Sequence, residues 1–130
     1  MQHVRAEYQH HECKDEDGRV VAFDEARDSG CAIALSTDYN PGSAPCPSQP
    51  MTMAIACRYQ KLLPSEALNA SCINAAFGIA CEATVGSIEV GKQADFVMLH
   101  ADDYRMMALE FGGNLVSSVF KKGKVVYESK

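Results

Sequence analysis

Apolar residues form two kinds of pattern along the chain, and these patterns predict its elements. Residues 31–35 are a short unbroken apolar run between Gly30 and an Asn-Pro-Gly turn, which is typical of a buried strand in a parallel sheet. In residues 51–60 and 64–78 the apolar positions instead recur three and four residues apart, the spacing of a helix. The pattern therefore predicts one strand followed by helices.

The helix boundaries can be predicted from individual residues. Pro64 and Glu66 suit a first helical turn, because proline needs no N–H bond there and an acid is stabilised at the positive end of the helix dipole. Leu63, the residue before them, is a poor N-cap, and we expect a break near Asn74. Upstream, Gly30 predicts the end of another helix, since glycine commonly follows a helix C-terminus.

After Gly86 the pattern changes to that of strands. Residues 86–90 are expected to form a short strand, and residues 95–99 a buried one. Residues 116–120 and 125–127 predict a hairpin with Gly123 in its turn. The proline-rich residues 41–50 should be loop, so the order is a strand, helices, and then three or four strands.

Composition and charge narrow the class of protein. The chain has 130 residues, 47% of them hydrophobic and 22% charged, which fits one modest globular domain. A net charge of −5 without a basic face argues against nucleic-acid binding. There is no apolar stretch of the roughly 18 to 20 residues that a membrane span needs, and no signal-peptide pattern. We expect a cytoplasmic protein with reduced, buried cysteines, because the six cysteines contain no CxxC pair.

Asp38 is the first candidate for chemistry. It stands at the carboxyl end of the predicted strand 31–35 and opens into a loop with Gly42, which is where α/β folds place catalytic groups. A simpler interpretation is an Asx turn, in which an Asp or Asn before Pro-Gly bonds its own backbone. The residues taken alone favour the turn.

Longer motifs change that balance. The stretches "ALSTDYNPGSAP", "GSIEVGKQADFVML" and "FKKGKVVYE", with the helical segments between them, resemble the C-terminal part of the imidazolonepropionase family, within the metal-dependent amidohydrolase superfamily. The resemblance runs from about residue 28 to about residue 128. "GSIEVGKQADFVML" is typical of the whole superfamily, whereas Asn-Pro-Gly after the acid is typical of imidazolonepropionases.

The resemblance implies an α/β fold, namely the C-terminal fragment of a (β/α)₈ amidohydrolase barrel with strands of a small composite β-sandwich domain. Residues 28–85 would be the last barrel strand and the helices after it. Residues 86–130 would be the C-terminal strands of the β-domain. Residues 1–27 are a polar segment that stays unassigned.

The resemblance also implies roles for the loop. Asp38 would be a ligand of one zinc or iron ion and the catalytic acceptor of a proton from metal-bound water. Asn40 and Gly42 would hold the propionate end of a small-molecule substrate, and Ser43 would lie next to its ring. The implied reaction is hydrolysis of 4-imidazolone-5-propanoate to N-formimidoyl-L-glutamate in histidine degradation. These roles agree with general chemistry, since a divalent ion lowers the pKa of bound water and glycine lets backbone amides approach an anion.

The chain contains no HxH motif, which the superfamily's metal site requires. Its histidines are His3, His10, His11 and His100, of which His10 and His11 are expected to be a solvated pair and His100 to lie away from the site. A catalytic zinc takes three protein ligands, and a complete barrel takes about 250 residues. We therefore expect a fragment that is inactive alone, unless it meets the missing N-terminal barrel portion.

Two alternatives remain at this point. The chain could derive from another cyclic-amide hydrolase or deaminase of the superfamily, although the Asn40-Pro41-Gly42 turn argues against that. It could instead be a non-catalytic α+β module whose exposed edge is covered by a second copy in a homo-oligomer or by an N-terminal partner chain. Four further candidates for substrate contacts are interpreted as packing or surface residues: Tyr39, Arg58, Tyr59 and Arg105.

Overall fold

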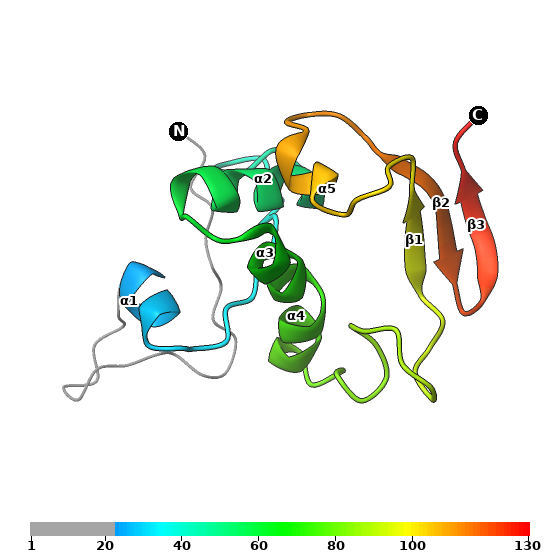
Figure 1. The fold of residues 1–130 in the computed structure, drawn as a ribbon, viewed down its shortest axis with the longest axis horizontal. Helices are drawn as coiled ribbons and strands as arrows, with labels where there is room; N and C mark the ends of the chain where they lie inside the picture. The colour runs from blue at the N-terminus through cyan, green and yellow to red at the C-terminus, as the bar shows by residue number, and fades with distance from the viewer. Residues whose placement is uncertain (1–22) are drawn as a thin grey trace.

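The computed structural model describes residues 23–130, which form a cluster of short helices and a separate antiparallel sheet (Figure 1). In chain order the elements are α1 (Phe23–Asp28), α2 (Gln49–Tyr59), α3 (Pro64–Ser71), α4 (Ile73–Gly78), β1 (Phe96–Leu99), α5 (Met106–Leu109), β2 (Val116–Lys121) and β3 (Lys124–Glu128). The predicted helices over residues 51–60 and 64–78 are confirmed, as is the helix that ends just before Gly30.

Local capping explains where these helices begin and divide. Ser48 precedes α2, and its Oγ accepts a hydrogen bond from the Met51 N–H at 3.3 Å. Leu63 offers α3 no side-chain acceptor, but Glu66 compensates because its Oε2 accepts the Leu63 N–H at 2.7 Å. The expected break lies at Cys72, two residues before Asn74, where the backbone leaves helical geometry.

A small apolar core holds the helices and the preceding segment together. Its members are Ile33, Leu35, Met53, Ala56, Leu62, Ala67 and Ala70. Three of the seven are alanines, which allow α2 and α3 to approach closely, and α5 packs on the other side of α2. No large side chain among the described residues is fully buried, so this core contributes modest hydrophobic stabilisation.

The prediction of a strand over residues 31–35 is wrong for this structure. The segment is neither helix nor strand, although Ile33 and Leu35 are buried, Ala34 between them is partly buried and Ala32 before them is exposed. That alternation is the one a strand would have. A strand also needs a neighbouring strand for its ladder, and none lies beside this segment among residues 23–130; helices α3 and α4 flank it instead.

The sheet has the order β1-β2-β3, and both pairings are antiparallel. The predicted hairpin is confirmed: Lys122 and Gly123 both have positive φ, 52° and 73°, as a two-residue hairpin turn of the primed type requires. The turn is tied to the start of β1, because the Gly123 N–H donates to the Ala94 carbonyl at 2.9 Å.

Two other strand predictions need correction. Residues 86–90 form turns, with Ile88 and Val90 exposed, and Gly86 at φ 93° packs so tightly that a Cβ would come within 2.6 Å of the Ala76 Cβ. Residues 86–90 therefore form a turn that packs tightly against α4 on the way to β1. Strand β1 exists, but its middle residues are exposed because the sheet does not pack on the helices.

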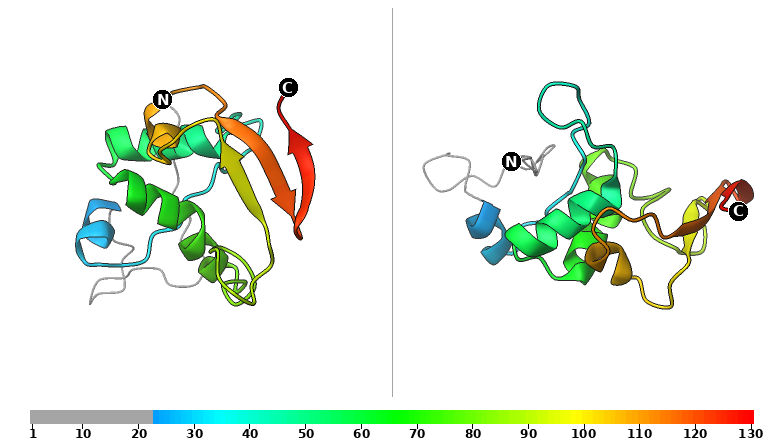
Figure 2. Two further views of the ribbon diagram at one scale, coloured as in Figure 1. Left: turned by 45° about the vertical axis from the view of Figure 1, so that its right-hand side comes forward. Right: turned by 90° about the horizontal axis from the view of Figure 1, so that it is seen from above.

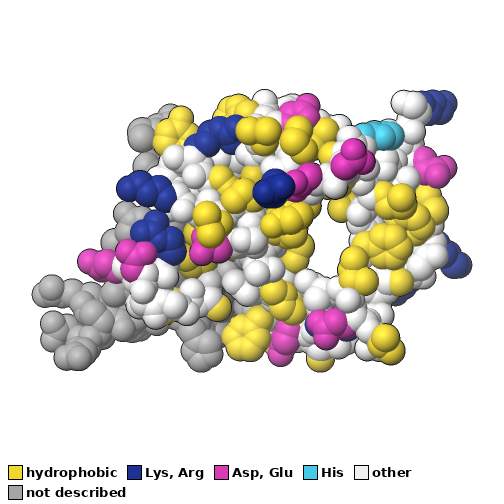
Figure 3. Space-filling view, in the orientation of Figure 1, with side chains coloured by type: hydrophobic (Ala, Val, Ile, Leu, Met, Phe, Trp, Pro, Cys, Tyr) yellow, Lys and Arg dark blue, Asp and Glu magenta, His cyan; other side chains and the backbone are white. Residues whose placement is uncertain are grey.

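The sheet stands apart from the helical cluster in Figure 1 and in the view from above (Figure 2, right). The space-filling view shows an opening between the two parts, with apolar side chains gathered over the sheet (Figure 3). Phe96 and Phe120 stack across β1 and β2 with ring centroids 4.4 Å apart. The sheet is thus held by its own pairing and carries apolar surface that nothing among the described residues covers.

The cysteines differ from the expectation of reduced, buried thiols. Cys46, Cys57, Cys72 and Cys81 are free, but none is fully buried, and Cys31 is disulfide-bonded. Desolvation raises the pKa of the Cys57 and Cys72 thiols, which makes both poor nucleophiles. Among residues 23–130, no helix has the length and apolar character needed to cross a membrane.

Candidate functional site

The loop that follows residue 35 is organised by the side chain of Asn40. Its Oδ1 accepts the N–H groups of Gly42 and Ser43 at 3.0 and 2.8 Å and the Ser43 hydroxyl at 3.3 Å. Its Nδ2 donates to the Asp38 carbonyl at 2.6 Å, and its N–H donates to the Ala44 carbonyl at 3.0 Å. Asn40 therefore makes the Asx turn and gathers Asp38, Gly42 and Ser43 around itself.

Asp38 is held in an unusual backbone conformation. Its φ is 47°, a left-handed value that costs an L-residue about 1–2 kcal/mol. Its N–H donates to the Ser36 Oγ at 3.2 Å, while its carboxylate makes no hydrogen bond or ion pair with the described residues. The Asx turn thus belongs to Asn40, and the Asp38 carboxylate is left available for another partner.

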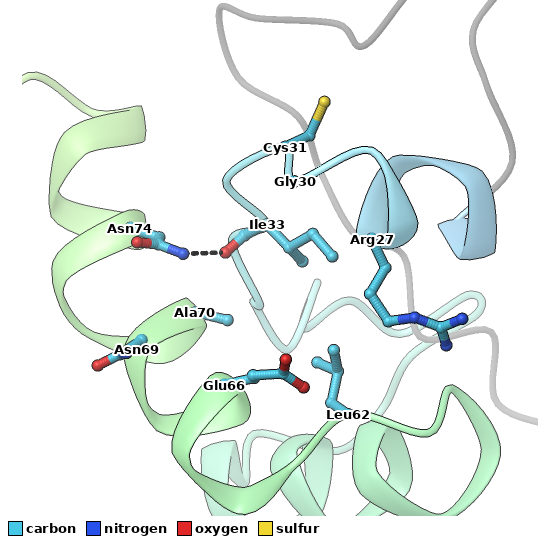
Figure 4. Close-up of a pocket in the computed structure, with 9 residues that line it drawn as sticks. All are labelled: Arg27, Gly30, Cys31, Ile33, Leu62, Glu66, Asn69, Ala70 and Asn74. Carbon is cyan, nitrogen blue, oxygen red and sulfur yellow. Dashed lines mark hydrogen bonds between the residues drawn. The ribbon is translucent and has the colours of Figure 1, made fainter.

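Two amide side chains, which sequence reasoning missed, fix the segment that leads to Asp38. Gln49 Nε2 donates to the Leu35 carbonyl at 3.1 Å and to Ser71 Oγ at 2.9 Å. Asn74 Nδ2 donates to the Ile33 carbonyl at 2.9 Å (Figure 4). The bonds to the Leu35 and Ile33 carbonyls join residues 14 and 41 positions apart, so no local pattern in the sequence indicates them.

The predicted site residues divide by position. Asp38, Asn40, Gly42 and Ser43 lie together in one loop. His100 follows β1, and its Nε2 lies 2.7 Å from Ser129 Oγ, so it belongs to the sheet. His3, His10 and His11 lie outside the described residues.

A bound metal ion does not fit the described residues alone. No three His, Cys, Asp or Glu side chains come together anywhere in residues 23–130. Asp38 is one candidate carboxylate ligand, and a catalytic zinc takes three protein ligands. The chemistry of an ion therefore cannot be assigned to this part of the chain by itself.

Arg58 has a structural role, which agrees with its interpretation from the sequence as a packing residue. Its guanidinium donates to the carbonyls of Ala108 and Leu109 at 2.7 Å each and lies 5.2 Å from the centre of the Phe111 ring. It thereby ties α2 to the end of α5. Arg105 pairs with Asp103 at the surface.

A cavity of about 240 Å³ opens at the other end of the segment, beside Gly30 (Figure 4). Arg27, Glu66, Asn69 and Asn74 contribute polar side chains to it, and Ile33, Leu62 and Ala70 contribute apolar ones. It is separate from the Asp38 loop and shares with it only the segment between them.

Comparison with known proteins identifies the fold that carries this loop. The model of the amidohydrolase family matches residues 13–126. The chain belongs to the amidohydrolase family. Membership places the described elements in a (β/α)₈ amidohydrolase fold, of which the chain is a fragment.

The resemblance to imidazolonepropionases is confirmed by curated relatives. The chain is 54% identical over 99 residues to imidazolonepropionase of Chloroflexus aggregans, which covers 76% of this chain and 23% of the relative. Identity to the enzyme of Herpetosiphon aurantiacus is 52% over 94 residues, and to that of Treponema denticola 48% over 101 residues. The chain spans about a quarter of the length of these relatives.

Solved structures show the same fold. Guanine deaminase of E. coli superposes with a TM-score of 0.66 at 18% identity, over 84% of this chain and 30% of the deaminase. An amidohydrolase from Thermotoga maritima superposes with a TM-score of 0.64 at 24% identity, over 88% and 28%. At these identities the likeness speaks for the fold alone.

Proposed function

We propose that this chain is the C-terminal part of an imidazolonepropionase, which hydrolyses the cyclic amide bond of 4-imidazolone-5-propanoate to give N-formimidoyl-L-glutamate. The observation that carries the proposal is identity of 48 to 54% to three imidazolonepropionases over about three quarters of the chain. The chain spans about a quarter of their length, so the proposed activity belongs to a larger assembly of residues than these 130.

The Asn40 turn supports the proposed substrate contacts. Two backbone N–H groups and the Ser43 hydroxyl converge on Asn40 Oδ1 within 3.3 Å, and such a concave group of donors also accommodates a carboxylate oxygen. We assign Gly42 and Asn40 to the propionate end of the substrate and Ser43 to the ring side. In this arrangement the substrate carboxylate takes the place of Asn40 Oδ1, while the amide of Asn40 turns to donate to it.

Asp38 has the proposed role of metal ligand and proton acceptor. Its support is the free carboxylate at the end of the segment fixed by Gln49 and Asn74. The remaining ligands, and with them the choice between zinc and iron, belong to residues outside the described part. A composite β-sandwich containing β1, β2 and β3, and a cytoplasmic location, complete the proposal.

A chimaera tests this function directly. Residues 28–130 of this chain replace the matching C-terminal quarter of the Chloroflexus aggregans enzyme, and ring opening is followed by loss of imidazolone absorbance. We expect an active chimaera, and loss of activity in its Asp38→Asn variant. Asp102→Asn is the matched control, because Asp102 is exposed and lies beyond the loop.

The outcomes separate clearly. A folded, metal-loaded chimaera with no ring-opening activity contradicts the proposed function. An Asp38→Asn chimaera that retains full activity removes Asp38 from the site even if the function stands. The 130-residue chain alone is expected to show no ring opening.

A further inference from the structure

The loop of residues 36–48, which carries the Asn40 turn, is joined to the described helices at its two ends. Between these ends, residues 36–47 form hydrogen bonds only with one another among the described residues. Ala44 is the one residue of the loop that is buried, and the loop projects from the helices in the view from above (Figure 2, right, between cyan and green). The orientation of the Asn40 turn therefore depends on how the two ends are held.

Gln49 holds both ends of this loop. It is the first residue of α2, directly after the loop, and its Nε2 donates to the carbonyl of Leu35, directly before the loop, at 3.1 Å. The same Nε2 donates to Ser71 Oγ at the end of α3 at 2.9 Å, so both hydrogens of the amide are used. Leu35 is 2% exposed, and its N–H donates to the Ala70 carbonyl at 2.9 Å. One side chain thus closes the base of the loop and fixes it to α3.

Closing the base restricts the conformations of the loop. A loop whose ends are held together has already lost the entropy of closure, and this entropy is not lost again when a ligand binds. Asn40 orders the tip, but its bonds lie within residues 38–44 and do not orient the tip relative to α2 and α3. The Gln49 bond to Leu35 supplies that orientation.

We propose that Gln49 is a positioning residue of the proposed substrate site, which holds the Asn40 turn in the orientation that receives the propionate end of the substrate. The inference rests on the proposed function for the identity of that substrate. Gln49 acts through the Leu35 carbonyl and the loop, without touching the substrate. Its loss should therefore weaken binding of the non-reacting end of the substrate and affect the chemical step less.

The order of the loop can be measured in the 130-residue chain itself. Backbone ¹⁵N relaxation gives order parameters of about 0.85 for rigid amides and below about 0.6 for flexible ones. We expect the Gly42 and Ser43 amides to be rigid in the unmodified chain and flexible in Gln49→Met, which keeps side-chain length and helix propensity but has no N–H donor. The Leu35 amide should stay rigid in both, because its bond to Ala70 is retained.

Two further variants separate this bond from a general effect on α2. In Gln49→Glu an acid is stabilised at the helix start, yet an ionised carboxylate cannot donate to the Leu35 carbonyl, so the loop should loosen as in Gln49→Met. Gln93→Met is the matched control, because the Gln93 amide bonds to Asp95 at 2.6 Å, away from the loop; Gly42 and Ser43 should stay rigid in it. If Gln49→Met fails to fold by circular dichroism, Gln49→Glu supplies the comparison.

Kinetics of the chimaera with the Chloroflexus aggregans enzyme test the consequence for the substrate. We expect Gln49→Met to raise the KM for 4-imidazolone-5-propanoate by about tenfold, the effect of one lost hydrogen bond, with a change in kcat of less than about threefold. Gln93→Met should change neither quantity. A variant that merely unfolds part of the enzyme would instead lower kcat, because fewer molecules would be active.

Three results overturn the inference: flexible Gly42 and Ser43 amides in the unmodified chain, equal order of these amides in Gln49→Met, or an active chimaera whose KM is unchanged by Gln49→Met. The proposed function fails separately. A folded, metal-loaded chimaera without ring opening contradicts the function, and the relaxation data then decide whether Gln49 orders the loop. An active chimaera with an unchanged KM leaves the function standing and removes Gln49 from the site.

Discussion

Asp38 combines a left-handed backbone with a carboxylate that no described neighbour holds. Strained residues of this kind persist where the surrounding structure over-determines them, and they cluster at functional sites. Here the determinants are the bond from Asn40 Nδ2 to the Asp38 carbonyl and the Ser36 hydroxyl that accepts the Asp38 N–H. The loop therefore imposes the strained conformation on Asp38.

Substituting Asp38 tests this strain through stability. Glycine adopts φ near 47° without a Cβ penalty, whereas alanine retains the penalty. We expect Asp38→Gly to have a free energy of unfolding about 1 kcal/mol higher than Asp38→Ala, measured by urea denaturation. Equal stability of the two variants would show that the loop relaxes and that no strain is stored.

The side-chain amide of Asn74 joins α4 to the segment that leads to Asp38, and we expect this bond to stabilise the fold. Its loss leaves the Ile33 carbonyl without its partner beside the core, so Asn74→Ala should lower the free energy of unfolding by about 1–3 kcal/mol. Asn69→Ala is the matched control, since Asn69 is exposed on α3 and its side chain bonds to no described residue. Comparable losses in the two variants would contradict a specific contribution of the Asn74 bond to the Ile33 carbonyl, because alanine itself favours a helix more than asparagine does.

The start of β1 is tied to the hairpin turn by Asp95. The Lys121 ammonium and the Lys122 N–H, with Gln93, lower the pKa of the Asp95 carboxyl from 3.8 to about 2. The unfolded carboxyl binds protons more readily, so this contribution to stability is present above about pH 4 and is lost as the pH falls toward 2. We expect the Asp95 carboxyl to titrate near pH 2 by NMR, in step with faster exchange of the Lys122 amide.

A variant isolates the contribution of Asp95. Asp95→Asn should flatten the pH dependence of the unfolding midpoint between about pH 4 and pH 2. Asp102→Asn should leave it intact, because Asp102 is exposed and bonds to no described residue. An Asp95 carboxyl that titrates near pH 3.8 would contradict its interactions with Lys121 and Lys122 at the hairpin turn.

The elements that sequence patterns predicted well are those stabilised by nearby residues. Helices α2 and α3 have their capping residues within a few positions, and the hairpin has its turn at Lys122 and Gly123. The strand prediction for residues 31–35 was wrong because a strand needs a neighbouring strand to bond with. The local sequence pattern does not show whether such a neighbour is present. The four loop residues were named from resemblance, but the central place of Asn40 and the amides of Gln49 and Asn74 depend on contacts that only the fold reveals.

The three-stranded sheet carries apolar side chains on both of its faces. The sheet pairs residues of like character on both faces, with Phe96, Phe120 and Val125 on one and Val97, Val119 and Tyr127 on the other. A three-stranded sheet normally buries at least one face. Its separation from the helices therefore indicates that further layers belong to this fold.

Zinc binding tests whether the site at Asp38 needs metal ligands from outside the described residues. Asp38 belongs to no group of three His, Cys, Asp or Glu side chains among residues 23–130, and a catalytic zinc normally takes three protein ligands. We expect any zinc taken up by the chain in equilibrium dialysis to have the same Kd in the Asp38→Asn variant. In the chimaera with the Chloroflexus aggregans enzyme, the Asp38→Asn variant should bind zinc about 10-fold or more weakly, as loss of a group that supports the metal does. A chain that binds zinc tightly through Asp38 on its own would overturn this view, because the site would then be complete without further residues.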